Sequence, residues 1–302
     1  MKDLLTPGLS GRPADATASI AERRWSECPV CRSRSSEPYV AFDEVAFVRC
    51  QGCPTVFKSF ESSSLRAPDF YERGYFHGRR SGRDRRFAHR VRKARRWILS
   101  ALEHVEARSL LDIGCSFGYV IEAGKRLGLS SAGADISAYA VQVCRARGYR
   151  AEVGSLEELP FRDGEFDIAI MKHVLEHTPT PRTALEEVRR VLSPGGAVLI
   201  ALPNLLYWKG QYRRREHRYF RPDDLGQQHY VYYTRDSLAL LLQRAGFEVV
   251  LSSKAHYRRK RAGNHLVGRG LESLRFAALA SWQALARGLL LQRELFTIAV
   301  KR

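Results

Sequence analysis

The sequence predicts an α/β protein in which a parallel sheet is preceded by a small cysteine-rich unit. Apolar runs of strand length alternate with helix-length segments from about residue 107 to residue 302. A glycine-punctuated turn joins the first of these strands to a helix. Nearer the N-terminus, four cysteines occur as two Cys-x-x-Cys pairs. These three observations define a two-part chain.

The cysteine pairs lie between residues 25 and 60 and are separated by 18 residues. This is a zinc-ribbon spacing, because each two-residue turn presents two thiolates to one tetrahedral ion. Two disulfides are the alternative, although a chain in a reducing compartment seldom keeps them. We expect a structural Zn²⁺ in a zinc-ribbon-like unit that is too small to fold without it. The expected ligands are Cys28, Cys31, Cys50 and Cys53.

The segments on either side of this unit are polar or basic. Residues 1–24 contain no apolar stretch of a secretory signal, and we expect them to form a flexible tail. Residues 61–106 begin with an aromatic patch that includes Tyr75 and Phe76. A helix is predicted over residues 83–106, because apolar positions recur there every three or four residues while arginines fill the other face. We expect residues 61–106 to form an aromatic and basic helical linker, in which Tyr75 and Phe76 pack the junction of the two parts, or a lid.

The most informative segment runs from residue 108 to residue 137. A strand that ends at Ile113 meets Gly114 and Gly118, a helix follows over 119–127, and a second strand ends on Asp135. Strand, glycine-rich turn, helix, strand and carboxylate make one half of a nucleotide-binding sheet. Glycines let the backbone approach a ligand closely, and the carboxylate can accept hydrogen bonds from both hydroxyls of a ribose.

The remaining strands and helices alternate to the end of the chain. An apolar run over 166–171 predicts a strand that is buried on both faces, as in parallel sheets. The other expected elements are a helix over 185–192 that residues 193–196 stop, a strand over 197–201, a helix and strand within 238–250, and a last strand over 295–300.

Asp112-x-Gly114-x-Ser116-x-Gly118 resembles motif I of the class I S-adenosylmethionine-dependent methyltransferases, and the resemblance covers about residues 107–302. It implies a Rossmann-like seven-stranded methyltransferase sheet, with aromatics of 61–106 as an alternative lid over S-adenosylmethionine. The family usually has glycine where Ser116 stands and commonly Asp where Ser155 stands. The cofactor-binding residues that the resemblance implies are Asp112, Gly114, Cys115, Ser116, Gly118, Asp135, Ile136, Ser155, Leu156, Lys172 and His173.

Two histidines are candidate catalytic residues. His177 follows the predicted strand over 166–171, where the crevice of such a sheet opens. If a helix starts here, His173, Glu176 and His177 share one face. They could then ligate a divalent metal, and they resemble the metal-site pattern of polyprenyl-quinone O-methyltransferases with His173 in place of a Glu. The alternative is that His173 lines the cofactor while Glu176 and His177 orient the loop.

His229 precedes an aromatic pair, an arrangement similar to that around the base of zinc-bearing deoxysugar C-methyltransferases. The Glu and Tyr that accompany that base are replaced here by Gln228 and Gly226. The resemblance therefore carries over the histidine but not its partners, and His229 is the second candidate.

The chain is strongly basic, with 50 Lys and Arg against 32 Asp and Glu and a net charge of +18. Clusters over 79–96, 209–221 and 254–261 would attract a polyanion, either RNA or an anionic membrane. Residues 265–292 predict an amphipathic helical insertion, suited to a membrane interface or to docking on the sheet. No run of 18 uncharged apolar residues occurs, so we expect a cytoplasmic chain, peripheral at the inner membrane face.

The function favoured by these observations is methyl transfer from S-adenosylmethionine to a small molecule, a sugar or glycan precursor, or a lipid-type acceptor. The alternative is a zinc-ribbon RNA methyltransferase acting on rRNA or tRNA, a class that also joins these two parts. A third class, a non-catalytic protein that only binds the cofactor, is disfavoured because the glycines and Asp135 are intact.

Overall fold

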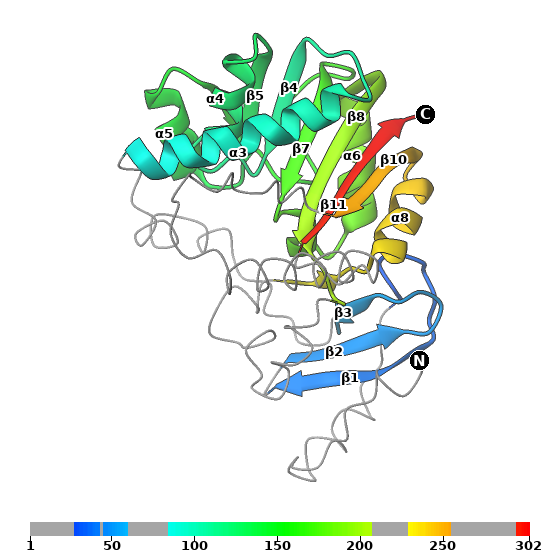
Figure 1. The fold of residues 1–302 in the computed structure, drawn as a ribbon. Coiled ribbons are helices and arrows are strands. Elements are labelled where there is room, and N and C mark those ends of the chain that lie inside the picture. Colours follow the sequence, from blue (N-terminus) through cyan, green and yellow to red (C-terminus); the bar gives the residue numbers. More distant parts are fainter. Residues whose placement is uncertain (1–26, 43–44, 60–83, 207–228, 255–293) are drawn as a thin grey trace, which may run out of the picture.

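The computed structural model describes residues 27–42, 45–59, 84–206, 229–254 and 294–302 (Figure 1). Its elements in chain order are β1 (Ser36–Phe42), β2 (Val45–Cys50), β3 (Val56–Lys58), α3 (Asp84–Leu102), β4 (Ser109–Ile113), α4 (Tyr119–Lys125), β5 (Ser130–Asp135), α5 (Ala138–Ala146), β6 (Arg150–Val153), β7 (Phe166–Lys172), the 3-10 helix η3 (Leu175–His177), α6 (Pro181–Val191), β8 (Leu192–Pro203), β9 (Val231–Tyr232), α8 (Arg235–Arg244), β10 (Phe247–Lys254) and β11 (Glu294–Lys301).

The larger sheet has seven strands in the order β10-β11-β8-β7-β4-β5-β6. The strands from β8 to β6 in this order pair in parallel, whereas β11 runs antiparallel to both β8 and β10. The predicted α/β fold with a seven-stranded, mostly parallel sheet is therefore confirmed. Because the parallel strands share one direction, the loops that follow β4, β5 and β7 gather at one edge of the sheet.

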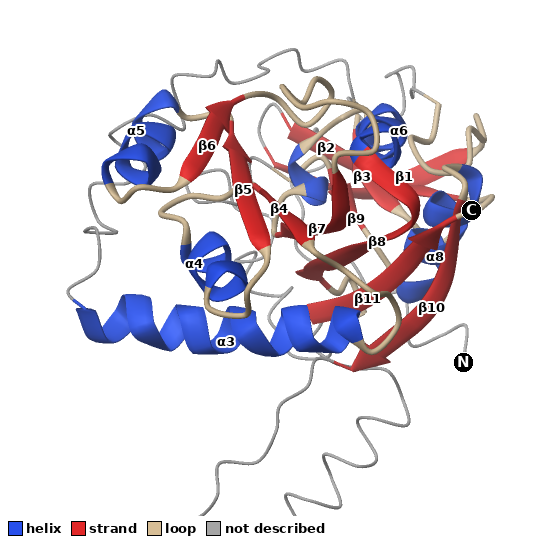
Figure 2. Cartoon of the chain, turned by 90° about the horizontal axis from the view of Figure 1, so that it is seen from above, coloured by secondary structure: helices blue, strands red, loops and turns tan. Residues whose placement is uncertain are grey.

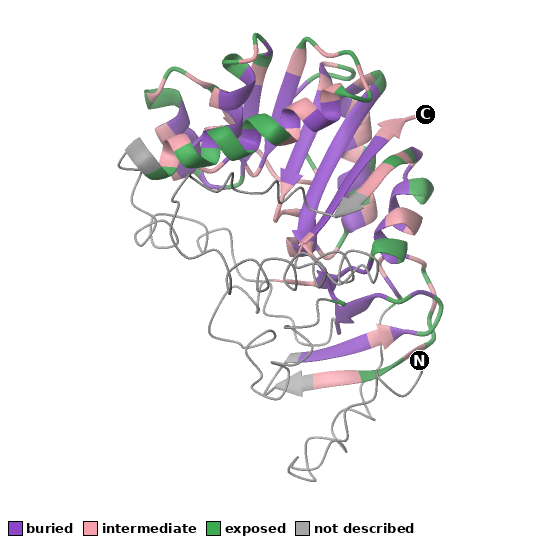
Figure 3. Cartoon of the chain, viewed as in Figure 1, coloured by how far each residue is buried: buried purple, intermediate pink, exposed green. Residues whose placement is uncertain are grey.

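Helices cover both faces of this sheet (Figure 2). On one face, α3 and α4 pack on the sheet through a cluster that includes Val91, Ile98 and Val120. On the other face, α6 and α8 contribute Leu185 and Leu241 to a second cluster. The central strands are buried from both sides, as the continuous apolar runs predict (Figure 3).

The helix boundaries follow local chemistry. At the start of α8, the Thr234 hydroxyl accepts a hydrogen bond from the Ser237 backbone N–H, and the Ser237 hydroxyl accepts one from the Thr234 N–H. At the end of α6, the chain turns directly into β8 at Leu192, five residues before the predicted strand start. Residues 193–196 form an irregularity between the Phe166–Leu192 and Ile168–Ala197 pairs. The helix therefore ends just before residues 193–196, as predicted, but the strand begins ahead of these residues and includes them.

A smaller antiparallel sheet of order β1-β2-β3-β9 lies beyond the carboxyl ends of the parallel strands (Figure 1). Its first three strands come from the cysteine segment, and β9 comes from the region assigned by sequence to the larger part of the chain. Val56 pairs with Tyr232 and Phe57 with Val231. One apolar cluster is shared by the cysteine segment and the larger sheet. The two parts are therefore joined by a common strand.

Several sequence predictions fall on residues outside the described ranges. They are the tail over 1–24, the aromatic patch with Tyr75 and Phe76, the basic cluster over 209–221, most of the cluster over 254–261, and the amphipathic insertion over 265–292. The helix predicted over 83–106 is α3, and its exposed basic side chains are Arg86, Arg90, Arg92, Lys93, Arg95 and Arg96. Of the helices in the described part of the chain, none combines the length and apolar character that a membrane crossing requires.

Candidate functional site

The glycine-rich turn after β4 is held against the end of β5. The N–H groups of Gly114 and Cys115 donate to the Ala134 carbonyl at 2.8 and 3.0 Å. Gly114 has φ +74°, and a Cβ there would lie 2.5 Å from Val174 Cγ2. Gly118 also has positive φ, at +78°. The turn thus requires glycine at both positions, for backbone conformation and, at Gly114, for space.

Ser116 stands between these glycines in a left-handed conformation, with φ +48°. This explains why a glycine is usual at that position in the family it resembles, because a side chain disfavours this region of φ. The backbone N–H of Ser116 donates to Asp135 Oδ2 at 2.8 Å, which holds the turn in place. Cys115 packs its side chain among Ile121 and Cys144, so only its backbone can face a ligand.

Asp135 ends β5 with its carboxylate against the turn. Oδ2 accepts from Ser116 N, and Oδ1 accepts from the Ser137 N–H at 3.0 Å. The predicted ribose-binding acid therefore lies against the glycine-rich turn. Beside it, Ile136 is 41% exposed, which is an unusual position for a large apolar side chain and suits stacking on a flat ring.

Asp112 supplies an unpaired polar atom beneath the turn. The side chain is 3% exposed, and Oδ2 has no hydrogen-bond partner among the described residues. Burial raises the pKa of Asp112 well above its usual value. A buried oxygen without a donor costs about 1–3 kcal/mol, which a ligand N–H group can recover. The amino group of S-adenosylmethionine offers such a donor, so these residues fit that cofactor.

The loop after β6 lies beside the end of β5. The Gly154 N–H donates to the Asp135 carbonyl at 3.1 Å, which holds the loop beside β5. The Ser155 hydroxyl accepts from the Glu158 N–H at 3.1 Å, and Leu156 packs against the main apolar cluster. The structure thus fixes Gly154 on Asp135, and Ser155 and Leu156 follow directly in the chain.

Lys172 and His173 have partners on another strand. Lys172 Nζ lies 3.8 Å from Glu294 Oε1 and 5.5 Å from the centre of the Trp97 ring. His173 Nε2 lies 3.1 Å from the same Glu294 oxygen, and its Nδ1 lies 3.2 Å from Glu176 Oε1. The hydrogen bond with His173 lowers the pKa of Glu294 to about 2. Sequence reasoning missed Glu294, because nothing local connects β11 with a residue 121 positions earlier.

The helix that would place His173, Glu176 and His177 on one face does not form. His173 has φ +54°, and only the three-residue 3-10 helix η3 follows it. The ring of His177 instead packs against that of His229, with centroids 4.7 Å apart. Burial lowers the pKa of His229 to about 4. The two candidate catalytic histidines are therefore neighbours, although 51 residues separate them in the chain.

The backbone ties this histidine pair to the cysteine sheet. Tyr230 N donates to the Glu176 carbonyl at 2.8 Å, and Lys58 N donates to the Tyr230 carbonyl at 2.8 Å. The ring of His229 also lies 5.4 Å from that of Tyr232 on β9. The strand that completes the smaller sheet thus begins two residues after His229.

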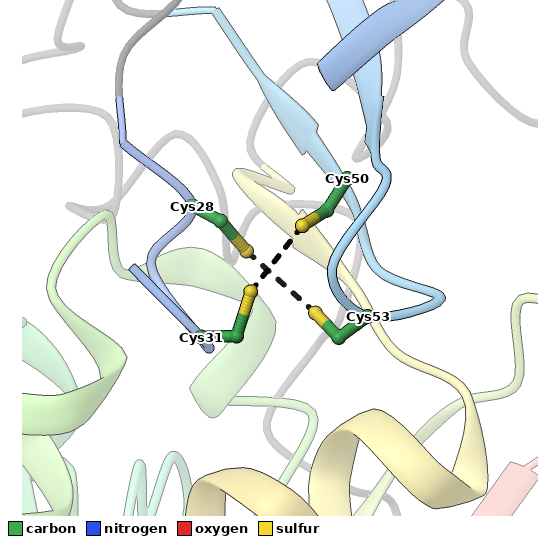
Figure 4. Close-up of side chains that lie close together, drawn as sticks. All are labelled: Cys28, Cys31, Cys50 and Cys53. Atoms are coloured by element: carbon green, nitrogen blue, oxygen red, sulfur yellow. Dashed lines mark hydrogen bonds between the residues drawn. The ribbon is translucent and has the colours of Figure 1, made fainter. Parts of the chain in front are cut away.

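The four predicted zinc ligands converge on one point (Figure 4). The Sγ atoms of Cys28 and Cys53 are 3.7 Å apart, and those of Cys31 and Cys50 are 3.3 Å apart. None of the six cysteines forms a disulfide. Sulfurs bound to a tetrahedral zinc at about 2.3 Å lie about 3.8 Å from one another. The separations and the all-thiol donor set fit Zn²⁺.

Residues 84–252, more than half of the chain, match the family described as a methyltransferase domain, so the chain belongs to this family. Ubiquinone biosynthesis O-methyltransferases from Alkalilimnicola ehrlichii and Erwinia tasmaniensis are 33% identical over 115 residues and 29% identical over 124 residues. These matches cover 36% and 38% of this chain, and 47% and 51% of the relatives. The chain thus spans about half the length of the curated relatives it matches.

Solved structures share the fold. The protein solved with the Haloferax volcanii Trm112 methyltransferase activator has a TM-score of 0.52 and 21% identity, over 76% of this chain and 96% of its own. An S-adenosylmethionine-dependent methyltransferase from Archaeoglobus fulgidus has a TM-score of 0.50 and 21% identity, over 75% and 99%. The Rossmann-like methyltransferase architecture expected from the sequence is therefore the observed one.

Proposed function

We propose that this protein transfers the methyl group of S-adenosylmethionine to a small-molecule acceptor. The observation that carries the proposal is the position of the Asp135 carboxylate against the Gly114–Gly118 turn. This pairing forms a site for a ribose beside a backbone that lacks side chains at the point of closest approach. The relatives named for ubiquinone biosynthesis support a small molecule as the acceptor class.

Different residues around the turn would bind different parts of the cofactor. Asp135 accepts hydrogen bonds from the ribose, the orphaned oxygen of Asp112 accepts one from the amino group, and Ile136 packs on the adenine with Ser155 and Leu156 at its edge. The bound sulfonium supplies an activated methyl group and a good leaving group. The protein must then mainly align the acceptor with that methyl group. His177 and His229, at the carboxyl edge beyond β7, orient the acceptor.

The cysteine sheet supports the acceptor side. Zn²⁺ at Cys28, Cys31, Cys50 and Cys53 would be structural, because four protein ligands leave no open position. The ion would order β1–β3, and β3 in turn pairs with β9, which begins two residues after His229. Zn²⁺ at the four cysteines would thereby help to hold His229 in place through the pairing of β3 with β9.

The exposed cations of α3 support contact with an anionic surface. We place the protein in the cytoplasm, peripheral at the inner membrane face, with a glycan-linked or lipid-linked acceptor as the narrower substrate class. The alternative, an RNA methyltransferase, predicts RNA binding that weakens by roughly 0.7–0.9 log unit per phosphate contact for each log unit of salt. Sedimentation with vesicles of anionic lipid and filter binding with RNA, each across a salt series, discriminate the two.

Calorimetric titration with S-adenosylmethionine tests the cofactor site. The wild-type chain should bind, and Asp135→Ala should weaken binding by about 5-fold to 150-fold, because two hydroxyl hydrogen bonds at about 0.5–1.5 kcal/mol each are lost. Asp236→Ala, the same change at an exposed position on α8, is the control and should bind normally. A folded wild-type chain that does not bind the cofactor refutes the proposed function.

A further inference from the structure

We infer that Glu176, His177 and His229 form a second metal site, distinct from the four cysteines, that binds a divalent cation on the acceptor side. Only its role in orienting an acceptor rests on the proposed function; binding of the ion does not. The ligands come from η3 and from His229, which lies two residues before β9. Among the described residues, this is the one group besides the cysteines with the geometry to hold an ion.

The separations of the ligand atoms suit one ion. One donor atom from each of the three residues lies within 4.8 Å of the other two. Nitrogen and oxygen donors bound to a common ion at about 2.0–2.2 Å lie roughly 3–4 Å apart. Small side-chain rotations bring the three donors to that spacing. The backbone needs no change, since Tyr230 N already bonds the Glu176 carbonyl and His177 N bonds the Val174 carbonyl at 2.9 Å.

The burial of Glu176 is an independent sign of a missing partner. This side chain is 2% exposed, and its Oε2 atom has no hydrogen-bond partner among the described residues. A carboxylate taken out of water is stable only when charge or hydrogen bonds compensate it. Its other oxygen, Oε1, is paired with His173. A cation between Glu176 and the two histidines would supply the missing compensation.

His173 belongs to the support of this site and not to the ligand set. Its Nδ1 contacts Glu176 and its Nε2 contacts Glu294, so both ring nitrogens are engaged. Carboxylates that ligate metals are commonly held in orientation by such hydrogen bonds. Glu294, His173 and Glu176 therefore form a chain from β11 to the ion.

The donor set indicates what the ion is and what it does. Two imidazoles and one carboxylate suit Zn²⁺, Co²⁺, Ni²⁺ or Mn²⁺ better than Ca²⁺, which prefers oxygen alone. Three protein ligands leave a coordination position open to water or to an oxygen of the acceptor. A bound ion would lower the pKa of a coordinated hydroxyl group, so the site would favour acceptors that offer a hydroxyl oxygen.

Cobalt titration of the full chain tests the inference. After brief chelation, the protein is titrated with Co²⁺ while the absorption spectrum and the number of bound ions are measured. Wild-type protein should hold a second ion whose spectrum shows d–d bands without thiolate charge transfer. Glu176→Gln and His229→Ala should each lose this ion and keep the thiolate-bound one. His104→Ala, which alters an exposed histidine after α3, should keep both.

Two results would overturn the inference: a wild-type chain that binds metal only at the thiolates, or a non-thiolate ion that survives in both Glu176→Gln and His229→Ala. The near-isosteric Glu176→Gln keeps the test valid should His229→Ala fold poorly. Titration with S-adenosylmethionine separates this inference from the proposed function. A chain that binds the second cobalt but not the cofactor keeps the metal site and loses the methyltransferase.

Discussion

The proposed cofactor side and acceptor side of the site are built in different ways. Most of the cofactor side comes from one stretch, from Asp112 to Ile136, in which strand, turn, helix and strand follow one another, and the loop with Ser155 and Leu156 adds its edge. The acceptor side collects Glu176 and His177 after β7, His229 before β9, and Glu294 from the last strand. A local motif can be read from sequence, whereas an assembly of distant segments appears only once the chain has folded.

The two sides also depend on the cysteine sheet to different degrees. The turn and Asp135 are held by hydrogen bonds within the larger sheet. His229 is placed by β9, which pairs with β3. Loss of the smaller sheet should therefore damage the acceptor side and spare the cofactor side.

Removal of the structural metal should have the largest effect. Cys28→Ser combined with Cys53→Ser should abolish zinc binding and the order of β1–β3, since structural zinc sites contribute on the order of 10 kcal/mol to folding. Affinity for S-adenosylmethionine should stay within about 3-fold, a difference below 1 kcal/mol. Metal content, hydrogen exchange of β1–β3 and cofactor titration measure these outcomes. A similar loss of cofactor binding would show that the two sides are one unit.

Gly114→Ala should have the next largest effect. The added Cβ would lie 2.5 Å from Val174 Cγ2 at φ +74°, so we expect a cost of about 2–4 kcal/mol in unfolding free energy and loss of cofactor binding. Gly128→Ala is the matched control, with φ +81° and no atom within 4 Å of the new Cβ. It should cost only about 1–2 kcal/mol. Equal effects in urea denaturation would refute the steric argument.

Glu294→Gln should lower the free energy of unfolding by about 1–2 kcal/mol, by an amount that depends on pH. The effect is no larger because the His173–Glu294 pair is partly exposed to solvent. The folded-state pKa of Glu294, about 2, lies below the usual 4.5, so this stabilisation is present above pH 4.5 and disappears as the pH falls toward 2. Hydrogen bonds to Glu176 and Glu294 raise the pKa of His173 despite its burial. The stabilisation that protonated His173 contributes is therefore fully present below pH 6.5 and declines as the pH rises through the folded-state pKa of His173.

Stability curves of Glu294→Gln and wild type should therefore differ most between pH 4.5 and 6.5 and converge near pH 2. Urea titrations across this range measure the difference. A difference that does not change with pH would mean that the charge of Glu294 plays no part.

Ser116→Gly should have the smallest effect on stability, and it should stabilise the protein whereas the other substitutions destabilise it. Glycine adopts φ +48° without the penalty of a Cβ, which should stabilise the turn by about 0.5–1 kcal/mol after the loss from a more flexible unfolded chain. A rise in thermal midpoint with unchanged cofactor affinity supports this. A fall would mean that the serine side chain makes a stabilising contact of its own.

The fold, and the turn with the carboxylate beside it, could be predicted from the sequence for physical reasons. Apolar runs with strand and helix periods identify the strands of a buried parallel sheet, and Gly114 and Asp135 mark the turn and its carboxylate. The cysteine spacing likewise identified a group that converges in space. These signals lie within short stretches of chain.

The rest required the folded structure. Two-residue strand β9 carries no periodicity, so its pairing with β3 could not be foreseen. The expected helix after β7 is replaced by a left-handed His173 and a single 3-10 turn. His173 still contacts Glu176, but His229 and not His173 groups with Glu176 and His177. The positive φ of Ser116 could not be predicted from the serine itself either, because serine usually avoids this backbone conformation.

The shared strand has a consequence for the order of events during protein synthesis. Val56 cannot pair with Tyr232 until β4 to β8, five of the seven strands of the larger sheet, have left the ribosome. Until then, the N-terminal cysteines must stay reduced, or bind their ion in an antiparallel sheet that lacks its fourth strand. Completion of the smaller sheet thus waits until most of the chain has been synthesised.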